Sequence, residues 1–448
     1  MKTKIIATYG PGIERKSVLS KLVKHVDIFR INFSHGNEAS WLDAVENILS
    51  VSGSEGKEVS LLADLPGPKI RLGSLEKGIS VNKGDTVTFR YGKPAEGRIP
   101  LDHNIYHYLT SGSSISIGDG YMSFSIKGLR KGDIICRAMN SGTLLSRKGI
   151  NIRNGNVTAA PPTIEDVKLA KFAKKNNFDF IGLSFVRSAE NILKMRKAIG
   201  ESFIVAKIER ADAVKNIDEI AEEADGIMVA RGDLAFEIPV ERLPIAQAKI
   251  IHSSMKHHKP VIVATQMLAS MVNSPMPTRA EVNDIAGAVM GGVDCVMLSE
   301  ETAVGNYPID AVRILAATAK NAEEMSSRNQ NFKIGGISDS IAFAAAEIAD
   351  NYKTDCIFAP TQTGSTAMKL SALRPSSDII ALSRSPKVRR RLGIFYGVRS
   401  GEIKGYGSVD KMLRLVKEVA ASRGIKRYIV VSGSPNHAGS TNTLQYIE

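Results

Sequence analysis

Short apolar runs alternate with longer amphipathic stretches along most of the 448-residue chain. Each apolar run has the length of a strand and is hydrophobic on both faces, which is typical of parallel strands covered by helices. Eight such runs occur, at residues 4–8, 26–32, 59–64, 180–185, 204–208, 226–230, 261–265 and 295–299. Helical spacing follows them at residues 15–24, 38–49, 164–176, 189–199, 211–222, 244–257, 278–290 and 308–325. Eight strand–helix units in series predict a (β/α)8 barrel.

The third strand–helix unit is interrupted by a long segment. About 100 residues separate Asp64 from the helix expected at Ile164, whereas a loop between a strand and its helix usually has ~2–6 residues. The segment contains strand-like runs at residues 86–91, 114–117, 121–126 and 134–139, separated by glycine-containing turns. We therefore expect a small all-β domain, residues 66–153, inserted after strand 3 on the side of the barrel where the strands end.

A third region follows the polar connector at residues 326–331. The alternation of strands and helices resumes at residues 341–349, 356–359, 365–372, 379–382, 387–395, 410–420 and 428–431. This pattern predicts an open α/β sheet. The expected division is a barrel of residues 1–65 and 154–328, the inserted domain of residues 66–153, and a C-terminal α/β domain of residues 329–448.

The composition is that of an ordinary globular protein. Its hydrophobic fraction is 43% and its charged fraction 23%, which excludes intrinsic disorder and a small disulfide scaffold. The three cysteines, Cys136, Cys295 and Cys356, lie far apart without metal-ligand spacing, which indicates a reducing compartment and no structural zinc. No apolar run approaches the ~20 residues of a membrane helix. We expect a cytoplasmic protein without a membrane partner.

The net charge of +13 raises the question of an anionic partner. Nucleic acid is one interpretation, and its best support is the run Arg389-Arg390-Arg391. That run lies in a predicted helix without interleaved aromatic residues, so a solvated face or a subunit contact is the more ordinary interpretation. From residue 332 to 448 there are 17 Lys and Arg against 9 Asp and Glu. The excess of positive charge therefore favours anionic metabolites as partners, and no nucleic acid. Most of this excess lies in the C-terminal domain.

Polar residues follow the carboxyl ends of at least six of the eight expected barrel strands, where active sites of such barrels form. Glu209 and Asp233 end neighbouring strands, and two carboxylates suit Mg²⁺ with water and substrate oxygens. Nearby Lys and Arg side chains suit phosphate and carboxylate groups. Alternatively, a single strand-end charge is often only a paired surface charge, Asp64 only a turn residue, and His35 only a loop histidine. The shared position of so many polar residues favours one site for phosphoryl transfer.

Nine dispersed segments then carry a family resemblance. They are residues 3–8 with Gly10-Pro11, 30–36, 64–71, 147–151, 204–209, 228–234, 264–268, 277–281 and 296–303. Through these segments the chain resembles the pyruvate kinases along nearly its whole length. The resemblance implies a glycolytic enzyme that moves the phosphoryl group of phosphoenolpyruvate to ADP, giving pyruvate and ATP. It also implies Mg²⁺ or Mn²⁺, a homotetramer, and an inserted β-barrel that closes over the cleft as a lid.

The resemblance assigns roles to particular residues. Glu209 and Asp233 would bind the metal, and the amides of Gly232 and Asp233 the substrate carboxylate. Lys207 and Arg30 would stabilise the phosphoryl group and the developing enolate. Thr265 would lie beside the enolate, with Ser299 in a proton relay. The nucleotide side would comprise Thr8, Pro11, Asn32, His35, Arg71, Asp119 and Lys148, the last two on the lid.

One departure from the family pattern concerns monovalent cations. Leu65 and Pro66 replace the Thr-Lys pair of many members, and Lys69 replaces a Glu found in enzymes that require K⁺. A tethered ammonium can supply the charge that K⁺ supplies elsewhere, so we expect activity without K⁺. Oxygen atoms of Asn32, Ser34, Asp64 and Leu65 still offer a site, which leaves K⁺ binding open.

The C-terminal domain resembles the family's regulatory domain. Its candidate phosphate loop comprises Thr361, Thr363, Gly364, Ser365 and Thr366, at the start of a predicted helix. Hydroxyls and helix N-terminal amides suit a phosphorylated effector, while an N-capping loop explains the same residues equally well. The stretch at residues 432–440 would lie nearby.

A different barrel enzyme acting on phosphoenolpyruvate or pyruvate, such as an aldolase-type lyase, is the second functional hypothesis. Such an enzyme would not need a lid with Lys148 and Asp119, which distinguishes it from the first.

Overall fold

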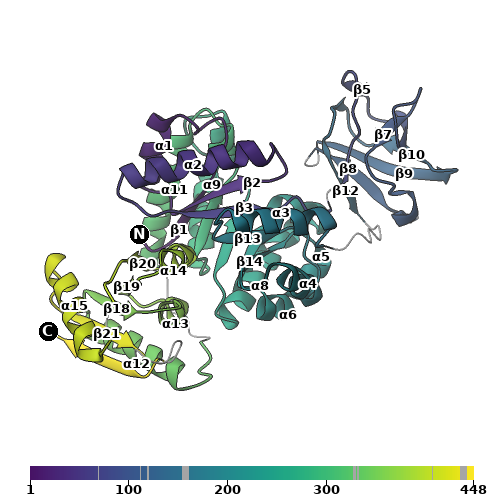
Figure 1. The fold of residues 1–448 in the computed structure, drawn as a ribbon. Helices are drawn as coiled ribbons and strands as arrows, with labels where there is room; N and C mark the ends of the chain where they lie inside the picture. The colour runs from purple at the N-terminus through teal and green to yellow at the C-terminus, as the bar shows by residue number, and fades with distance from the viewer. Residues whose placement is uncertain are drawn as a thin grey trace.

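The computed structural model describes the chain except for residues 69, 111, 119–120, 154–160, 326–328, 330–331, 406 and 434–440, and except for the side chains of Asn151 and Arg153. Three bodies are visible: a strand barrel wrapped by helices, an all-β unit to one side of it, and an α/β unit below it (Figure 1). Lys69, Asp119 and most of the predicted 326–331 and 432–440 segments lie outside the described residues.

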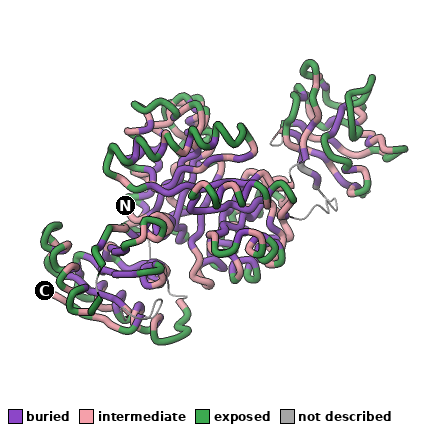
Figure 2. Tube along the Cα trace, in the orientation of Figure 1, coloured by how far each residue is buried: buried purple, intermediate pink, exposed green. Residues whose placement is uncertain are grey.

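Eight parallel strands close into a barrel, which confirms the predicted fold. In chain order they are β1 (Lys4–Thr8), β2 (Ile28–Asn32), β3 (Ser60–Asp64), β13 (Phe180–Leu183), β14 (Phe203–Ile208), β15 (Gly226–Ala230), β16 (Val261–Ala264) and β17 (Cys295–Leu298). The barrel closes where Ile6 of β1 pairs with Met297 of β17. Nearly every strand residue is buried, because side chains fill the barrel inside and helices cover it outside (Figure 2).

The outer helices follow the strands as predicted. They are α1 (Lys16–Val23), α2 (Glu38–Ser54), α3 (Ile164–Lys175), α4 (Ala189–Ile199), α5 (Ala211–Lys215), α6 (Ile217–Glu223), α8 (Leu243–Lys256), α9 (Arg279–Met290) and α11 (Pro308–Ala322). The single helix expected at 211–222 is in fact two, because the backbone leaves the helical conformation at Asn216. Two short helices at the carboxyl ends of strands, α7 (Arg231–Glu237) and α10 (Glu300–Ala303), were not predicted. Within the described part of the chain, no helix has the length and apolar character to cross a membrane.

The inserted segment forms a small all-β unit. Its strands are β4 (Ile70–Arg71), β5 (Ile79–Val81), β6 (Thr86–Tyr91), β7 (Ile99–Leu101), β8 (Ser114–Ile117), β9 (Met122–Arg130), β10 (Asp133–Ala138), β11 (Gly142–Leu144) and β12 (Gly149–Arg153). Seven of them form one sheet in the order β4-β12-β8-β9-β10-β6-β7, and β5 pairs with β11. A bridge between Leu72 and Leu101 joins the two sheet edges, so the sheet curls into the expected small barrel. Phe89 and Phe124 meet edge to face in its core.

The C-terminal region is an open α/β sheet, as predicted, with five strands in the order β20-β19-β18-β21-β22, of which β20 and β22 were not predicted. Its elements are α12 (Ile337–Tyr352), β18 (Cys356–Pro360), α13 (Ser365–Leu373), β19 (Asp378–Leu382), α14 (Pro386–Arg391), β20 (Val398–Gly401), α15 (Val409–Ser422), β21 (Tyr428–Ser432) and β22 (Thr443–Ile447). The first four strands are parallel and β22 is antiparallel.

A repeated aspartate ties the amino ends of the barrel strands together. Four aspartates each precede a strand and accept the backbone N–H of the first or second residue of the strand before it in the barrel. The pairs are Asp27 with Ile5 (3.0 Å), Asp179 with Leu61 (3.0 Å), Asp225 with Ile204 (2.8 Å) and Asp294 with Val261 (2.9 Å). Each carboxylate thus satisfies a backbone donor that would otherwise lack a partner at the barrel rim. We call these four residues the amino-end aspartates.

The three consecutive arginines dock the C-terminal unit onto this rim. Arg389 makes a bidentate ion pair with Glu58, from Nε to Oε2 at 2.8 Å and from Nη2 to Oε1 at 2.9 Å. Arg390 pairs with Asp179 at 3.0 Å, and Arg391 donates to the carbonyl of Glu201 at 2.8 Å. The run therefore makes contacts within the chain, which corrects its interpretation as a solvated face.

Candidate active site

Most of the predicted active-site residues lie at the carboxyl ends of the barrel strands, opposite the amino-end aspartates. Arg30 lies on β2, Asp64 on β3, and Lys207 on β14, with Glu209 directly after it. Gly232 and Asp233 lie on α7, which begins where β15 ends, while Thr265 and Ser299 follow β16 and β17. Residues 207 and 209 are two apart at the end of one strand, so their side chains emerge on the same face.

Lys207 is the centre of a buried ion-pair network. Its Nζ lies 2.9 Å from Asp64 Oδ1 and 3.0 Å from Glu209 Oε1. It also donates a hydrogen bond of 2.7 Å to Ser184 Oγ. The residue is only 8% exposed. The structure thus brings together Lys207 and Glu209, as predicted, and adds Ser184, which was not.

Asp64 joins this network to Arg30. The Arg30 Nε lies 2.6 Å from Asp64 Oδ2, and Arg30 Nη1 donates to Thr8 Oγ1 at 2.9 Å. Thr8 Oγ1 in turn donates to the carbonyl of Leu298 at 2.8 Å. Asp64 is therefore more than a turn residue, because its carboxylate sets the separation of two cations.

The pKa shifts follow from burial and from these pairs. Burial alone would raise the pKa of the Asp64 carboxyl, but Lys207 and Arg30 hold it below its ordinary value. Burial would lower the pKa of Lys207, yet the carboxylates of Asp64 and Glu209 raise it above its ordinary value. The amine is consequently charged at neutral pH. It can stabilise negative charge, but it cannot act as a base.

Glu209 is the point where negative charge is least compensated. Burial, together with the nearby carboxylates of Asp233 and Asp64, raises its pKa above the ordinary value despite Lys207. Its Oε2 accepts the backbone N–H of Phe185 at 2.6 Å, which fixes the carboxylate. Over the described residues, no group of three or more His, Cys, Asp or Glu side chains could hold a metal ion. Two carboxylates with an excess of negative charge fit a Mg²⁺ that takes its other ligands from water and substrate.

Thr265 and the start of α7 are directly linked. Thr265 Oγ1 accepts the N–H of Gly232 at 2.7 Å and donates to the carbonyl of Ala264 at 2.5 Å. Both Thr265 and Gln266 have left-handed backbones, with φ of 70° and 54°. Two predicted substrate residues are thus placed in contact, in a backbone conformation that the sequence did not predict.

Ser299 follows β17, the strand next to β16 in the barrel. Its N–H donates to Glu301 Oε2 at 2.7 Å, and its buried hydroxyl has no hydrogen-bond partner among the described residues. Glu301 also accepts the N–H of Leu268 at 3.0 Å and is itself buried. Glu301 therefore holds the loops after β16 and β17 together. The sequence offered one signal for it, an acidic residue two positions after a strand-end serine.

The predicted nucleotide residues fall on two bodies. On the barrel, Thr8 belongs to the Arg30 network, while Pro11 and His35 are exposed on the loops after β1 and β2. The carbonyl of His35 accepts the indole N–H of Trp41 at 2.7 Å. Asn32 Oδ1 accepts the N–H of Ser34 at 3.0 Å.

The inserted unit carries the remaining nucleotide residues. Arg71 of β4 pairs in register with Gly149 of β12, and the carbonyl of Lys148 accepts the N–H of Leu72 at 2.9 Å. Arg71 and Lys148 are therefore neighbours on this unit. Strand β12 contacts helix α7 of the barrel, which connects the two bodies near the predicted substrate residues. Asp119 lies outside the described residues.

Three of the four residues expected at a monovalent-cation site, Asn32, Asp64 and Leu65, already have partners for their oxygen atoms. Asp64 faces two cationic side chains. The carbonyl of Leu65 accepts the hydroxyl of Ser184 at 2.6 Å, and Asn32 accepts the Ser34 amide. Lys69, which we expect to replace the ion, lies outside the described residues.

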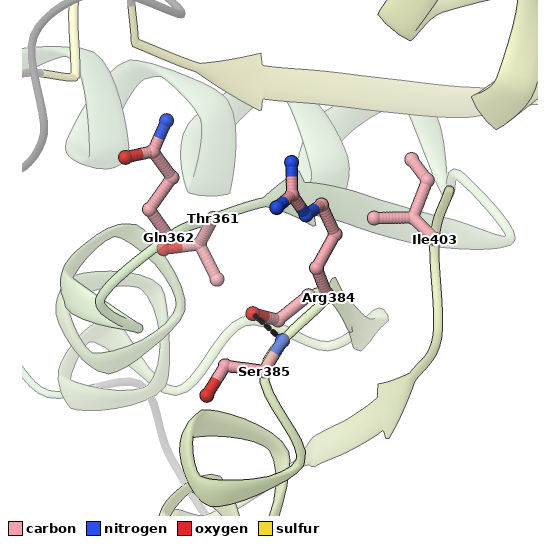
Figure 3. Close-up of a pocket in the computed structure, with 6 residues that line it drawn as sticks. Thr361, Gln362, Arg384, Ser385 and Ile403 are labelled. Atoms are coloured by element: carbon pink, nitrogen blue, oxygen red, sulfur yellow. Dashed lines mark hydrogen bonds between the residues drawn. The ribbon is translucent and has the colours of Figure 1, made fainter. Parts of the chain in front are cut away.

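A second candidate site lies in the C-terminal unit. A cavity of about 410 Å³ is lined by Thr361, Gln362, Ser383, Arg384, Ser385 and Ile403 (Figure 3). Thr361 Oγ1 accepts the N–H of Gly364 at 2.8 Å and Thr363 Oγ1 that of Ser365 at 3.4 Å, so both hydroxyls are bonded to backbone amides at the start of α13. Thr366 is buried against Thr441, 2.7 Å between hydroxyl oxygens. Arg384 and Ser385 were missed, although a Ser-Arg-Ser-Pro run after a strand is a signal.

Comparison with known proteins agrees with this geometry. Residues 1–312 match the family model described as pyruvate kinase, barrel domain, and residues 339–447 match that described as pyruvate kinase, alpha/beta domain. The pyruvate kinase of Thermococcus litoralis is 37% identical over 100% of this chain and 98% of its own length. The pyruvate kinase of Agrobacterium vitis is 36% identical over 100% and 96%, and that of Clostridium perfringens 35% identical over 99% of each.

Proposed function

The chain belongs to the pyruvate kinase family of glycolytic enzymes, which move the phosphoryl group of phosphoenolpyruvate to ADP, and from this premise we propose which of its residues carry the reaction. The main support is Lys207, which is buried and charged between Asp64 and Glu209 beside Arg30. Phosphoryl transfer needs charge neutralisation and positioning more than a covalent nucleophile.

Lys207 and Arg30 act as fixed positive charges. Both bind phosphoenolpyruvate and stabilise the transferring phosphoryl group and the enolate that forms as it leaves. Asp64 holds the two cations apart by its two oxygens, at 2.9 and 2.6 Å. Because the cations are ordered before substrate arrives, little reorganisation is needed in the transition state.

Glu209 and Asp233 hold Mg²⁺ or Mn²⁺. When bound, the divalent cation neutralises phosphate and enolate charge. The protein residues position the substrate. The amides of Gly232 and Asp233 bind its carboxylate, for which the Gly232 N–H exchanges its present acceptor, Thr265 Oγ1. The Phe185 N–H keeps the Glu209 carboxylate in place. Thr265 lies beside the enolate carbon that takes up a proton, and Ser299 belongs to the relay that supplies it.

The inserted unit closes over the barrel face as a lid. Its residues Arg71 and Lys148, with Asp119, bind the nucleotide together with Thr8, Pro11, Asn32 and His35 of the barrel. Closure excludes water from the transferring phosphoryl group. The domains are a barrel of residues 1–65 and 154–328, a lid of residues 66–153 and a regulatory domain of residues 329–448, and the contact of β12 with α7 supports the direction of closure.

The test is an assay of pyruvate formation coupled to lactate dehydrogenase. With phosphoenolpyruvate, ADP and Mg²⁺ we expect NADH to be consumed, and removal of ADP to stop the reaction. An aldolase-type lyase would show no dependence on ADP. Trp41, the only tryptophan, contacts the His35 carbonyl, so ADP alone should change its fluorescence if His35 belongs to the nucleotide site.

We propose that the enzyme does not require K⁺. The support is that Asp64, Asn32 and the Leu65 carbonyl already have partners in the chain, and that the sequence has Lys69 where family members that require K⁺ have Glu. Replacing KCl by a tetramethylammonium salt should leave kcat within about twofold. Strong activation by K⁺ at constant ionic strength would contradict this proposal.

We propose that the cavity at Thr361 and Arg384 binds a phosphorylated effector. Its support is the volume of about 410 Å³, with Arg384 and Ser385 in its lining beside the start of α13 (Figure 3). Sugar phosphates and nucleotides should raise the melting temperature of the wild type and not that of Arg384→Gln. A matched control, Arg399→Gln, changes an exposed arginine of the same sheet outside this lining. No shift with any compound would remove the support.

The enzyme is expected to be a cytoplasmic homotetramer, as the family resemblance implies. The exposed pair Tyr352 and Tyr446, on α12 and the outermost strand β22, supports association through the C-terminal unit. Multi-angle light scattering should give four times the 48.4 kDa chain mass. A monomer at micromolar concentration would contradict the assembly without affecting the catalytic assignment.

A further inference from the structure

The loop after β16 contains two consecutive residues in a strained backbone conformation. Thr265 has φ 70° and Gln266 φ 54°. The left-handed region is uncommon for any residue with a side chain, and it is a genuine outlier for a β-branched threonine. Strain of this kind persists only where the surrounding structure enforces it, and it clusters at functional sites.

Arg231 holds the backbone of Thr265 in this conformation. Its Nη2 and Nε donate to the carbonyl of Thr265 at 2.7 and 3.3 Å, so two donors grip one oxygen. Its Nη1 pairs with Asp284 Oδ2 at 2.5 Å. The side chain of Arg231 is 7% exposed, and burial strengthens these contacts by excluding water. Arg231 thus connects the strained carbonyl to helix α9.

Helix α9 is a firm support for this contact. Thr278 and Glu281 form a capping box at its start. Glu281 also accepts the N–H and hydroxyl of Ser270, at 2.8 and 2.6 Å, from the same loop that carries Thr265. Asp284 is therefore held at a fixed distance from the loop, and through Arg231 it fixes the Thr265 carbonyl.

The orientation of the Thr265 hydroxyl depends on this backbone. With the carbonyl held by Arg231, the hydroxyl meets the Gly232 N–H at 2.7 Å. We propose that Arg231 and Asp284 are positioning residues, which hold Thr265 in its left-handed conformation so that its hydroxyl, donating to the Ala264 carbonyl and accepting from the Gly232 N–H, stays beside the enolate carbon that is protonated. This inference rests on the proposed role of Thr265 in the reaction. Asp284 lies outside the substrate site and acts only through Arg231.

The experiment separates enolate protonation from phosphoryl transfer. Asp284→Ala removes the partner of Arg231, and Asp284→Asn keeps a hydrogen-bond acceptor but not the charge. We expect kcat of Asp284→Ala to fall between about tenfold and about 100-fold, with little change in the KM of either substrate. Exchange of pyruvate methyl protons in D₂O with Mg²⁺ and ATP, followed by proton NMR, should fall at least as far. In this step a methyl C–H bond breaks, and a deuteron from solvent replaces the proton.

A rescue experiment distinguishes positioning from general stability. Gln266→Asn places a residue that tolerates the left-handed region next to Thr265, and should recover part of the kcat lost in Asp284→Ala. Alone, it should match the wild type. Asn283→Ala, an exposed neighbour on α9, is the matched control and should leave both rates unchanged.

Three results would overturn the proposal: wild-type kcat and exchange in Asp284→Ala, a loss confined to KM, or a loss that tracks only the melting temperature without rescue by Gln266→Asn. If Asp284→Ala does not fold, the same measurements are made on Asp284→Asn, for which we expect a smaller loss of kcat and of exchange. Failure of the proposed function would look different, because the wild type itself would then form no pyruvate from phosphoenolpyruvate and ADP.

Discussion

The two ends of the barrel use the same residue types for different purposes. At the amino ends, each of the four aspartates accepts a backbone N–H from the strand before it, and two also meet an arginine of the C-terminal unit. At the carboxyl ends, Asp64 faces two side-chain cations, and Glu209 faces Lys207 as well as the backbone N–H of Phe185. A backbone N–H keeps its position as long as the protein is folded. A side-chain cation, in contrast, can exchange its carboxylate partner for a substrate anion. The first arrangement stabilises the fold, and we propose that the second takes part in the reaction.

Asp64 and Asp294 show the difference in their pKa values. Both are buried, yet the pKa of Asp294 lies above its ordinary value, because burial outweighs the arginine at 3.7 Å. The pKa of Asp64 lies below its ordinary value, because two cations at 2.6 and 2.9 Å outweigh the same burial. Two close cations, more than burial, thus distinguish Asp64 from Asp294.

The largest expected effect is that of Lys207→Met. Loss of the central cation should lower kcat by about 10³-fold or more, since it removes a charge aligned with the transition state. It also leaves Asp64 and Glu209 buried without their shared partner, which should cost about 3–5 kcal/mol of stability. The coupled assay and urea unfolding measure the two effects. Wild-type turnover in a folded Lys207→Met protein would contradict the catalytic role assigned to Lys207.

A matched pair of substitutions compares the two ends directly. Asp64→Asn should lower kcat by about 10²-fold, because Arg30 and Lys207 lose the charge that holds them in place. Asp294→Asn should leave kcat within about twofold and instead lower the free energy of unfolding by about 1–3 kcal/mol. Kinetics and chemical denaturation on both variants give the comparison. Equal kinetic losses would show that the two ends do not differ in the way described.

The pH dependence of stability provides a third test, at Asp179. Burial raises the pKa of this carboxyl to about 6 despite Arg390. The native state therefore binds the proton more tightly than the unfolded chain, so the group stabilises the fold below about pH 4. That contribution, about 3 kcal/mol, is lost as the pH rises to about 6.

The free energy of unfolding of the wild type minus that of Asp179→Asn should accordingly decrease between pH 4 and 6. Denaturant titrations at several pH values measure this difference, which cancels the other titrating groups. An increase over the same range would mean that the ion pair with Arg390 outweighs burial.

The smallest expected effect is at the docking arginine Arg389. Arg389→Gln breaks its bidentate pair with the half-exposed Glu58, which should cost about 1 kcal/mol and lower the melting temperature by a few degrees. We expect kcat to be unchanged, since the pair lies at the amino end. Differential scanning calorimetry and the coupled assay check both statements, and a tenfold loss of kcat would instead couple this interface to the active site.

The barrel could be predicted because its strands are buried on both faces and read as continuous apolar runs. The short strands of the inserted unit could not. β4 has two residues, and β7 contains Pro100, so neither carries a readable alternation. Helix α7 was missed because it begins at Arg231, directly at the strand end, in a segment whose glycine suggested a loop.

The site was predictable where position along a strand decides it. Lys207 and Glu209, two residues apart at a strand end, belong to this class. Ser184 and Asp284 do not, because their roles depend on contacts with residues 23 and 53 positions away in the chain. The arginine run was misread for the same reason, since Glu58 lies 331 positions from Arg389.

The most direct test of the central claim is to follow the phosphoryl group itself. Wild-type protein with phosphoenolpyruvate, ADP and Mg²⁺ can be monitored by ³¹P NMR. We expect the phosphoenolpyruvate signal to be replaced one for one by the γ-phosphate of ATP, and Lys207→Met to show neither change. Release of inorganic phosphate without ATP, or transfer that survives the loss of Lys207, would contradict it.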